Sequence, residues 1–231
     1  MTAAGTGNNL KAELADFKRR RIREEASHLF FRHGYEGTTI DAIADQLQVT
    51  KPFIYSYYGN KGEILYDIAR VGITLSLAAL ENCLAAPGSP WDRLKAVVDQ
   101  VTRIVVENQE YIVVYQREEK NLDAGQARAI REQRSLFDHQ LAEVLVSGER
   151  SGEFQLDDPQ LTATTIGGMM SWVALWYQPR GRWAKAEIIT HVIRSVERLV
   201  AHGSTAGAKR PTARDATADK KSSTRAKGVT P

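Results

Sequence analysis

Apolar side chains recur along most of this chain at spacings of three and four residues, which is the period of an α-helix with one buried face. Between residues 17 and 33, for example, Ile22, Ala26, Leu29 and Phe30 fall on one such stripe. No segment alternates apolar and polar residues in the way a half-buried β-strand does. The pattern therefore predicts an all-α fold.

Glycine, proline and polar capping residues divide the chain into nine predicted helices. They span residues 17–33, 39–47, 51–58, 61–86, 91–107, 109–120, 124–150, 158–178 and 184–201. Gly34 ends the first helix, and Thr38 with Asp41 forms a capping-box-like start for the second. We expect four parts: a flexible arm over residues 1–16, a three-helix unit over 17–61, a larger helical domain over 62–202, and a disordered basic tail over 203–231.

The second and third predicted helices form the pattern of a helix-turn-helix, in which two short helices are joined by about three residues. Ile54 and Tyr58 lie four residues apart and are expected to face the core, which leaves the opposite face of that helix for the major groove of DNA. The candidate DNA-binding residues are Thr39, Thr50, Lys51, Pro52, Phe53, Tyr55, Ser56, Tyr57 and Lys61.

These candidates have different expected roles. Lys51 brings a donor to base edges or phosphate, while Tyr55 and Tyr57 donate to phosphate oxygens. Thr39 and Lys61 each lie at a helix N-terminus, where free N–H groups favour an anion. The plainer alternatives are that the threonines and Lys61 serve as caps and solvated charge, and that Phe53 packs inward.

The run TTIDAIADQLQVTKPFIYSYYGNKGEIL, residues 38–65, resembles the helix-turn-helix signature of the TetR family of repressors. The matching elements are the paired threonines 38–39, Ile43-Ala44, Val49-Thr50, the aromatic run 55–58 and the spaced Lys61. Two positions depart from that signature. Gln48 stands where the turn usually has glycine, so we expect the turn either to adopt a left-handed backbone there or to shift slightly. Tyr57 stands where histidine is usual.

The resemblance implies that residues 62–202 form a ligand-binding and dimerisation domain. In a homodimer the two reading helices lie roughly 34–36 Å apart, which implies double-stranded operator DNA with a palindromic sequence. The last predicted helix carries an apolar stripe that we expect to form an intersubunit four-helix bundle with helix 158–178. Its members are Ile188, Ile189, Val192, Ile193, Val196, Leu199 and Val200.

Two stretches, residues 109–119 and 167–181, combine aromatic and polar side chains as ligand pockets do. The candidate ligand-binding residues are Tyr115, Met169, Trp172, Trp176 and Arg180. The second stretch resembles the C-terminal domain of family members that regulate fatty-acid, steroid or aromatic-acid catabolism. That resemblance implies an acyl-CoA effector, with Arg180 and Arg182 pairing with a CoA phosphate. The alternative interpretation is that the aromatic residues form core or interface.

The predicted function is thus a ligand-responsive transcriptional repressor of a catabolic operon, released from its operator by a small effector. The alternative is a TetR-like regulator of an efflux or stress gene that senses a hydrophobic drug-like ligand. Neither interpretation requires a bound cofactor or a metal ion.

Composition and charge agree with this prediction. The net charge of +3 divides into +2 over residues 1–61, −4 over 62–202 and +5 over 203–231, so the basic ends are where nucleic acid is expected to bind. The single cysteine, Cys83, excludes an intramolecular disulfide and is expected to be a small buried helix residue. No signal-like apolar run follows the N-terminus, and the stretch 71–86 is too short to span a bilayer, so we expect a cytoplasmic protein without a membrane partner.

Catalysis is not expected. Neighbouring acidic residues such as Glu118 and Glu119 point apart on a helix, and His139 with Glu143 supplies too few ligands for zinc. The sequence contains no phosphate-cradling glycine motif and no nucleophile elbow.

Overall fold

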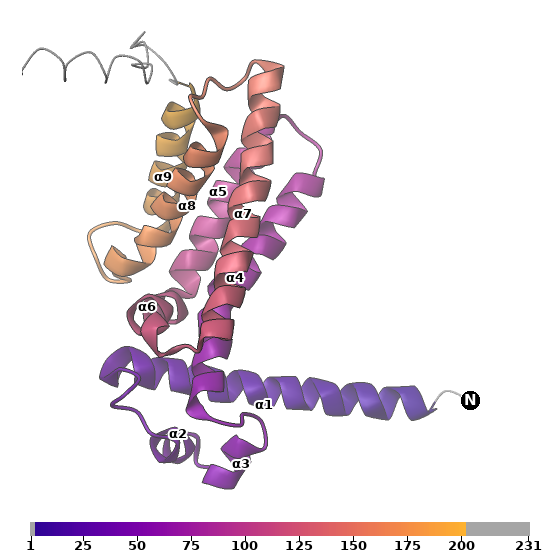
Figure 1. The fold of residues 1–231 in the computed structure, drawn as a ribbon, viewed down its shortest axis with the longest axis vertical. Helices are drawn as coiled ribbons and strands as arrows, with labels where there is room; N and C mark the ends of the chain where they lie inside the picture. The colour runs from indigo at the N-terminus through magenta and orange to yellow at the C-terminus, as the bar shows by residue number, and fades with distance from the viewer. Residues whose placement is uncertain (1–2, 202–231) are drawn as a thin grey trace, which may run out of the picture.

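The computed structural model describes residues 3–201, with side chains for residues 9–201, and each regular element in that range is helical (Figure 1). The elements are α1 (Ala3–His33), α2 (Ile40–Leu47), α3 (Lys51–Tyr55), α4 (Lys61–Ala85), α5 (Pro90–Glu107), α6 (Gln109–Glu118), the 3-10 turn η1 (Glu119–Asn121), α7 (Ala124–Ser151), α8 (Pro159–Trp176) and α9 (Lys185–Ala201). The all-α prediction is confirmed. The predicted basic tail at 203–231 lies outside the described residues.

Helices α1, α2 and α3 form a small head at the foot of the molecule (Figure 1). Within it, α1 lies crosswise between the α2–α3 pair and the taller bundle. The head has its own apolar core, in which Ile22, Ile43 and Ile54 are fully buried. Ile64 and Ile68 of α4 enter the same core, so the first turns of α4 belong structurally to the head. This arrangement ties the short α3 to a 25-residue helix that continues into the bundle.

Three details of the head differ from the prediction. Helix α1 begins at Ala3 rather than Phe17, because residues 10–16 contain helix-forming side chains and no glycine or proline to stop the helix. The cap of α2 is Thr39, whose hydroxyl accepts from the backbone N–H of Ala42 at 3.1 Å, whereas Thr38 is buried and donates to the carbonyl of Gly34 at 2.9 Å. Helix α3 ends at Tyr55, three residues early, and a turn follows.

The turn between α2 and α3 is built around Gln48. Its backbone is left-handed, with φ 56° and ψ 42°, as expected for the residue that replaces a turn glycine. Its N–H donates to the carbonyl of Asp45 at 3.0 Å, and the next N–H, of Val49, donates to Ala44 at 3.0 Å. These bonds close the end of α2 and set the direction from which α3 starts.

The bundle is assembled around α4, which contacts α5, α6 and α7. By length and composition alone α4 is apolar enough to cross a membrane, but Leu77, Leu80 and Cys83 are buried against the neighbouring helices. The core position of α4 therefore accounts for its apolar composition. Burial also raises the pKa of the Cys83 thiol, in agreement with the expected buried helix residue.

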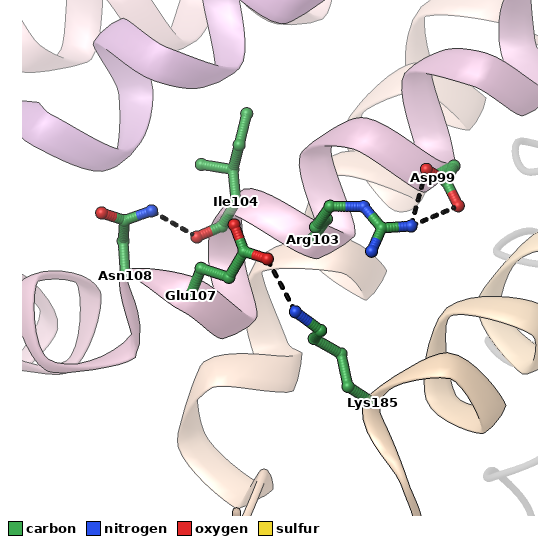
Figure 2. A network of polar contacts seen from close by, with 6 residues as sticks. All are labelled: Asp99, Arg103, Ile104, Glu107, Asn108 and Lys185. Carbon is green, nitrogen blue, oxygen red and sulfur yellow. Dashed lines mark hydrogen bonds and ion pairs between the residues drawn. The ribbon is translucent and has the colours of Figure 1, made fainter.

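The apolar stripe of α9 is used mostly inside the chain, contrary to the prediction. Five of its seven members are buried and α9 packs mainly against α5, because the stripe covers the open side of that helix. Lys185, in the first turn of α9, donates to Glu107 at the end of α5 at 2.6 Å and fixes this packing (Figure 2). The outward apolar face lies on α8 instead, where Leu161, Trp172 and Trp176 are exposed.

Candidate DNA-binding surface and effector cavity

The candidate DNA-reading surface is the outward face of α3 together with the turn before it. Thr50 occupies the N-cap position but its hydroxyl makes no capping bond, so its oxygen is available for a phosphate or a base edge. Pro52 and Tyr55 are exposed, Tyr55 to 46%, while Ile54 between them is fully buried. The predicted division of α3 into a core face and an outer face therefore holds for these residues.

Lys51 and Ser56 lie on the same outer surface but already have partners in the chain. The Lys51 ammonium is 2.9 Å from a carboxylate oxygen of Asp41 on α2, and the Ser56 hydroxyl donates to the carbonyl of Phe53 at 2.7 Å. Because the ion pair of Lys51 is solvent-exposed, it stabilises the head little and leaves the ammonium free to exchange to a phosphate.

Phe53 and Tyr57 are half-buried and pack on each other, with ring centroids 5.2 Å apart. The ammonium of Lys18 on α1 lies 5.8 Å from the centre of the Phe53 ring. These two aromatic residues thus support the position of α3 against α1, while their exposed edges remain beside the reading surface. For Phe53 the packing alternative is the better description.

Thr39 and Lys61 also serve within the chain. Thr39 caps α2, as described above. The Lys61 ammonium donates to the carbonyls of Tyr35 at 2.8 Å and Thr38 at 3.0 Å and lies 4.1 Å from the centre of the Tyr35 ring. Lys61 therefore joins the α1–α2 turn to the start of α4, and it has one further N–H for a phosphate.

A buried polar contact that the sequence did not reveal holds the end of the reading segment on α4. The hydroxyl of the buried Tyr58 donates to Asp67 at 2.6 Å, and the same carboxylate lies 3.5 Å from the guanidinium groups of Arg23 and Arg70. Burial and the neighbouring carboxylate raise the pKa of Tyr58, which keeps the hydroxyl protonated as a donor. Asp67 thus joins the end of the reading segment to both α1 and α4.

The bundle contains a cavity of about 230 Å³ enclosed by α4, α5, α6, α7 and α8. Most of its wall is apolar and includes Ile73, Val105, Ile112, Phe137 and Met170. The lining residues exposed to solvent are Gln116, Arg134, Thr164 and Gly168, so the mouth of the cavity lies between α6, α7 and α8. A concave, mainly apolar space with a few polar groups is the usual form of a small-molecule site.

Two polar groups stand out in this wall. The hydroxyl of Tyr115 is buried and has no hydrogen-bond partner, and burial raises its pKa. The carboxyl of Asp138 accepts a 3.3 Å hydrogen bond from Thr164, and burial raises its pKa more than that bond and the charge of Arg134 lower it. Both groups retain hydrogen-bonding capacity that a bound molecule can use.

Of the five predicted ligand-binding residues, the structure places only Tyr115 in the cavity wall. Met169 is half-buried against the main core, Trp172 is 61% exposed, and Arg180 is exposed in the segment between α8 and α9. Trp176 lies instead beside Trp183, with ring centroids 6.4 Å apart. The helical phase of α8 explains this placement, because it turns Gly167, Met170 and Ser171 toward the cavity and the tryptophans away. Trp176 lines a separate hollow together with Trp183 and residues of α9.

The cavity residues that the sequence analysis missed include four from α7. Arg134 and Asp138 lie one turn apart on a stripe that also contains Ile130, Phe137 and Leu141, three buried apolar residues. Two charged residues within an otherwise apolar helix stripe were the feature of the sequence that could have pointed to a polar group in a buried cavity.

The fold defines a class of protein: a helix-turn-helix DNA-binding protein with a helical C-terminal domain that contains a cavity. Residues 22–68 match the family described as bacterial regulatory proteins, tetR family, and residues 87–200 match the tetracyclin repressor-like C-terminal domain. The chain belongs to the TetR family and is a transcriptional repressor, not an enzyme. Among the described residues, no group of three or more His, Cys, Asp and Glu is placed to hold a metal ion.

Individual relatives agree with the family. The chain is 36% identical over 81 residues to the HTH-type transcriptional repressor SCO4008 of Streptomyces coelicolor, a match that covers 35% of this chain and 38% of that relative. It is similar in structure to the TetR family regulator PfmR of Thermus thermophilus, with 28% identity, a TM-score of 0.72 and coverage of 77% of this chain and 97% of PfmR. AibR, solved in complex with isovaleryl coenzyme A and operator DNA, shares the fold at 24% identity and a TM-score of 0.68, over 78% of this chain and 97% of AibR.

Proposed function

We propose that this repressor controls a catabolic operon for fatty-acid, steroid or aromatic-acid breakdown, and that an acyl-CoA thioester releases it from a palindromic operator. Without effector, a homodimer holds its two reading surfaces at the spacing of the operator half-sites. The effector binds the cavity, shifts the helices that line it and moves the reading surfaces out of register. To change occupancy substantially it must bind the DNA-incompetent state better by several kcal/mol.

The observation that carries this proposal is the position of α6. Val114 of α6 is fully buried in the core of the head, whereas the next residue, Tyr115, lines the cavity. A bound molecule that moves Tyr115 must therefore also move Val114 or distort one turn of helix. Well-packed interiors transmit such shifts because they do not deform continuously.

A second contact between α6 and the head acts at the α1–α2 turn. Glu118, at the end of α6, accepts a hydrogen bond from the backbone N–H of Tyr35 at 3.1 Å and another from Asn121 at 2.9 Å. Tyr35 in turn supplies its carbonyl to Lys61 of α4. A displacement of α6 thus reaches both the start of α2 and the start of α4, the two elements that position α3.

The size of the cavity favours a small acyl group. Its volume of about 230 Å³ lies below the range of roughly 300–1,000 Å³ typical of sites for drug-sized molecules. A short acyl chain fits inside while the coenzyme portion of a thioester extends through the mouth, where Arg134 can pair with a phosphate. AibR, with its bound isovaleryl coenzyme A, is the precedent within this fold. Arg180 is exposed outside the cavity wall and is the less favoured partner.

The homodimer is proposed from the outward face of α8. Leu161, Trp172, Leu175 and Trp176 recur on one side of that helix and are all exposed. Large apolar side chains gathered on one helix face mark an interaction surface. A two-fold contact between such faces would place two heads for a palindromic site.

Fluorescence anisotropy of the full chain on DNA from the region upstream of its own gene tests the proposal. We expect salt-sensitive, sequence-specific binding that butyryl-CoA or isovaleryl-CoA reverses and that free CoA and the free acids do not. Specific binding that no thioester disturbs would reject the acyl-CoA effector. Loss of all sequence preference would reject the operator-binding repressor itself.

A further inference from the structure

The cavity contains a polar pair whose chemistry narrows the class of effector, an inference that rests on the proposed function. Tyr115 is 8% exposed and its hydroxyl makes no hydrogen bond of acceptable geometry, although Arg134 and Glu119 lie near enough to act on its pKa. A buried hydroxyl left unpaired costs free energy that a ligand oxygen would recover by accepting its hydrogen. The effector therefore carries an acceptor oxygen, as the carbonyl of a thioester does.

Asp138 faces the same cavity with most of its acceptor capacity unused. The bond from Thr164, at 3.3 Å, is longer than a strong O–H···O contact. Opposite the carboxylate, Gly167 of α8 leaves it space, because a Cβ at that position would lie only 3.2 Å from the Asp138 Oδ1 atom. Burial also raises the pKa of this carboxyl, which reflects how few donors compensate its charge.

The charges in the wall select a neutral group. Arg134 lies one turn before Asp138 on α7 and also lines the cavity, and its charge acts on Asp138 by lowering the pKa. The charges of these two side chains sum to zero. A carboxylate or an ammonium brought beside them would add an uncompensated charge to a largely apolar space, whereas a hydroxyl would not.

We propose that the effector is a short hydroxyacyl thioester whose hydroxyl donates to Asp138 while one of its oxygens accepts from Tyr115. The hydroxyl supplies the donor that Asp138 lacks, and the thioester form removes the charge of the free acid. A plain acyl thioester of equal length fills the apolar wall but leaves the carboxylate without its donor. The cavity then distinguishes the two thioesters by one hydroxyl group. A site built to hydrogen-bond a hydroxyl binds an analogue that lacks this group poorly.

The experiment compares release of the full chain from operator DNA by 3-hydroxybutyryl-CoA, 4-hydroxybutyryl-CoA and butyryl-CoA. In the unaltered protein we expect one hydroxylated thioester to act at a concentration at least tenfold lower than butyryl-CoA. In Asp138→Leu the ratio of the effective concentration of butyryl-CoA to that of the hydroxylated thioester should fall to one or below. Glu132→Leu, the same change at an exposed position of α7, should keep the ratio, and Tyr115→Phe should weaken release by all three thioesters.

Asp138→Asn provides a second variant if the leucine variant does not fold. It keeps one acceptor oxygen and should give an intermediate ratio of effective concentrations. Thermal melting of each protein checks that it is folded. Equal potency of butyryl-CoA and both hydroxylated thioesters in the unaltered protein would overturn the inference and leave the acyl-CoA effector standing. A preference that persists in Asp138→Leu would do the same. Failure of every thioester to release DNA would reject both.

Discussion

Val114 and Tyr115 are neighbours on α6 but belong to different parts of the molecule: Val114 is buried in the core of the DNA-binding head and Tyr115 in the wall of the effector cavity. No linker separates the two sites at this point. One helical turn further, Glu118 holds the backbone of Tyr35 in the head. Helix α6 therefore connects the wall of the cavity directly to the core of the head.

Val114 provides the apolar packing contact between α6 and the core of the head. Val114→Ala removes two methyl groups from a fully buried site and should destabilise the protein by about 2 kcal/mol. It should also weaken coupling, so that the ratio of operator Kd values with and without butyryl-CoA moves toward one. Val113→Ala is the matched control, because Val113 is buried in the bundle core rather than in the head. A Val114→Ala protein with the unaltered ratio would contradict the role given to this residue.

The second prediction concerns Glu118. Glu118→Ala leaves the Tyr35 N–H without its acceptor and loosens the α1–α2 turn, which should reduce operator affinity by about 1 kcal/mol, or roughly fivefold. Glu118→Gln keeps an acceptor oxygen and should bind operator almost normally. Hydrogen exchange at the Tyr35 amide is the direct structural measurement. Unchanged protection of that amide in Glu118→Ala would show that the bond has no role in holding the turn.

Two threonines separate capping from DNA contact. Thr39→Ala removes a capping bond and should lower stability by about 1 kcal/mol. Thr50→Ala removes a hydroxyl that makes no capping bond, so stability should change by less than about 0.5 kcal/mol, while operator affinity should fall about tenfold, as for loss of one charge-assisted bond. Thermal melting and anisotropy of both variants distinguish the two roles. A Thr50→Ala protein that binds operator normally would remove Thr50 from the reading surface.

The raised pKa of Asp138 has a consequence for stability against pH. Because burial favours the protonated form, ionisation costs stability as the pH rises from the ordinary value of 3.8 through the raised value in the folded state. Asp138→Asn removes that cost and should be more stable at pH 7 by less than about 1 kcal/mol, since the group is only partly buried. In urea unfolding the advantage should shrink as the pH approaches 4. An advantage that grows toward acid pH would contradict the assigned cause.

The dimer face is tested by Trp172→Glu. A charge in the middle of the exposed α8 stripe should convert the protein to monomers in analytical ultracentrifugation and lower affinity for the palindromic operator by at least a hundredfold. Leu136→Glu, at an exposed apolar position of α7, should leave the assembly unchanged. If the first variant stays dimeric, the interface must lie elsewhere.

Much of the fold could be predicted because local chemistry determined it. Helix periodicity and the breakers at Gly34 and residues 87–90 placed every helix within a few residues, with the arm as the exception. The left-handed backbone at Gln48 is one of the two outcomes expected from its place in the turn. The predicted start of the first helix was wrong because residues 3–9 have little helix signal of their own. They are helical as an extension of the stronger segment that follows.

The ligand residues could not be predicted in the same way, because a cavity is a property of several helices together. Trp172 and Trp176 resembled pocket residues by composition, but the rotation of α8 against α7 turns them outward and brings in Thr164 and Gly167. The stripe of α9 had a similar ambiguity: periodicity identifies a buried face without saying whether the partner is α5 of the same chain or a second copy. Both choices depend on tertiary packing.

If effector and operator compete through α6, thermodynamic linkage relates their two affinities. Isothermal titration of the full chain with the releasing thioester should be performed with and without saturating operator DNA. We expect the thioester to bind at least tenfold more weakly to the operator complex, by the same factor as it weakens DNA binding. Equal thioester affinity in the two titrations would contradict this competition, because a ligand that does not distinguish the two states cannot shift their populations.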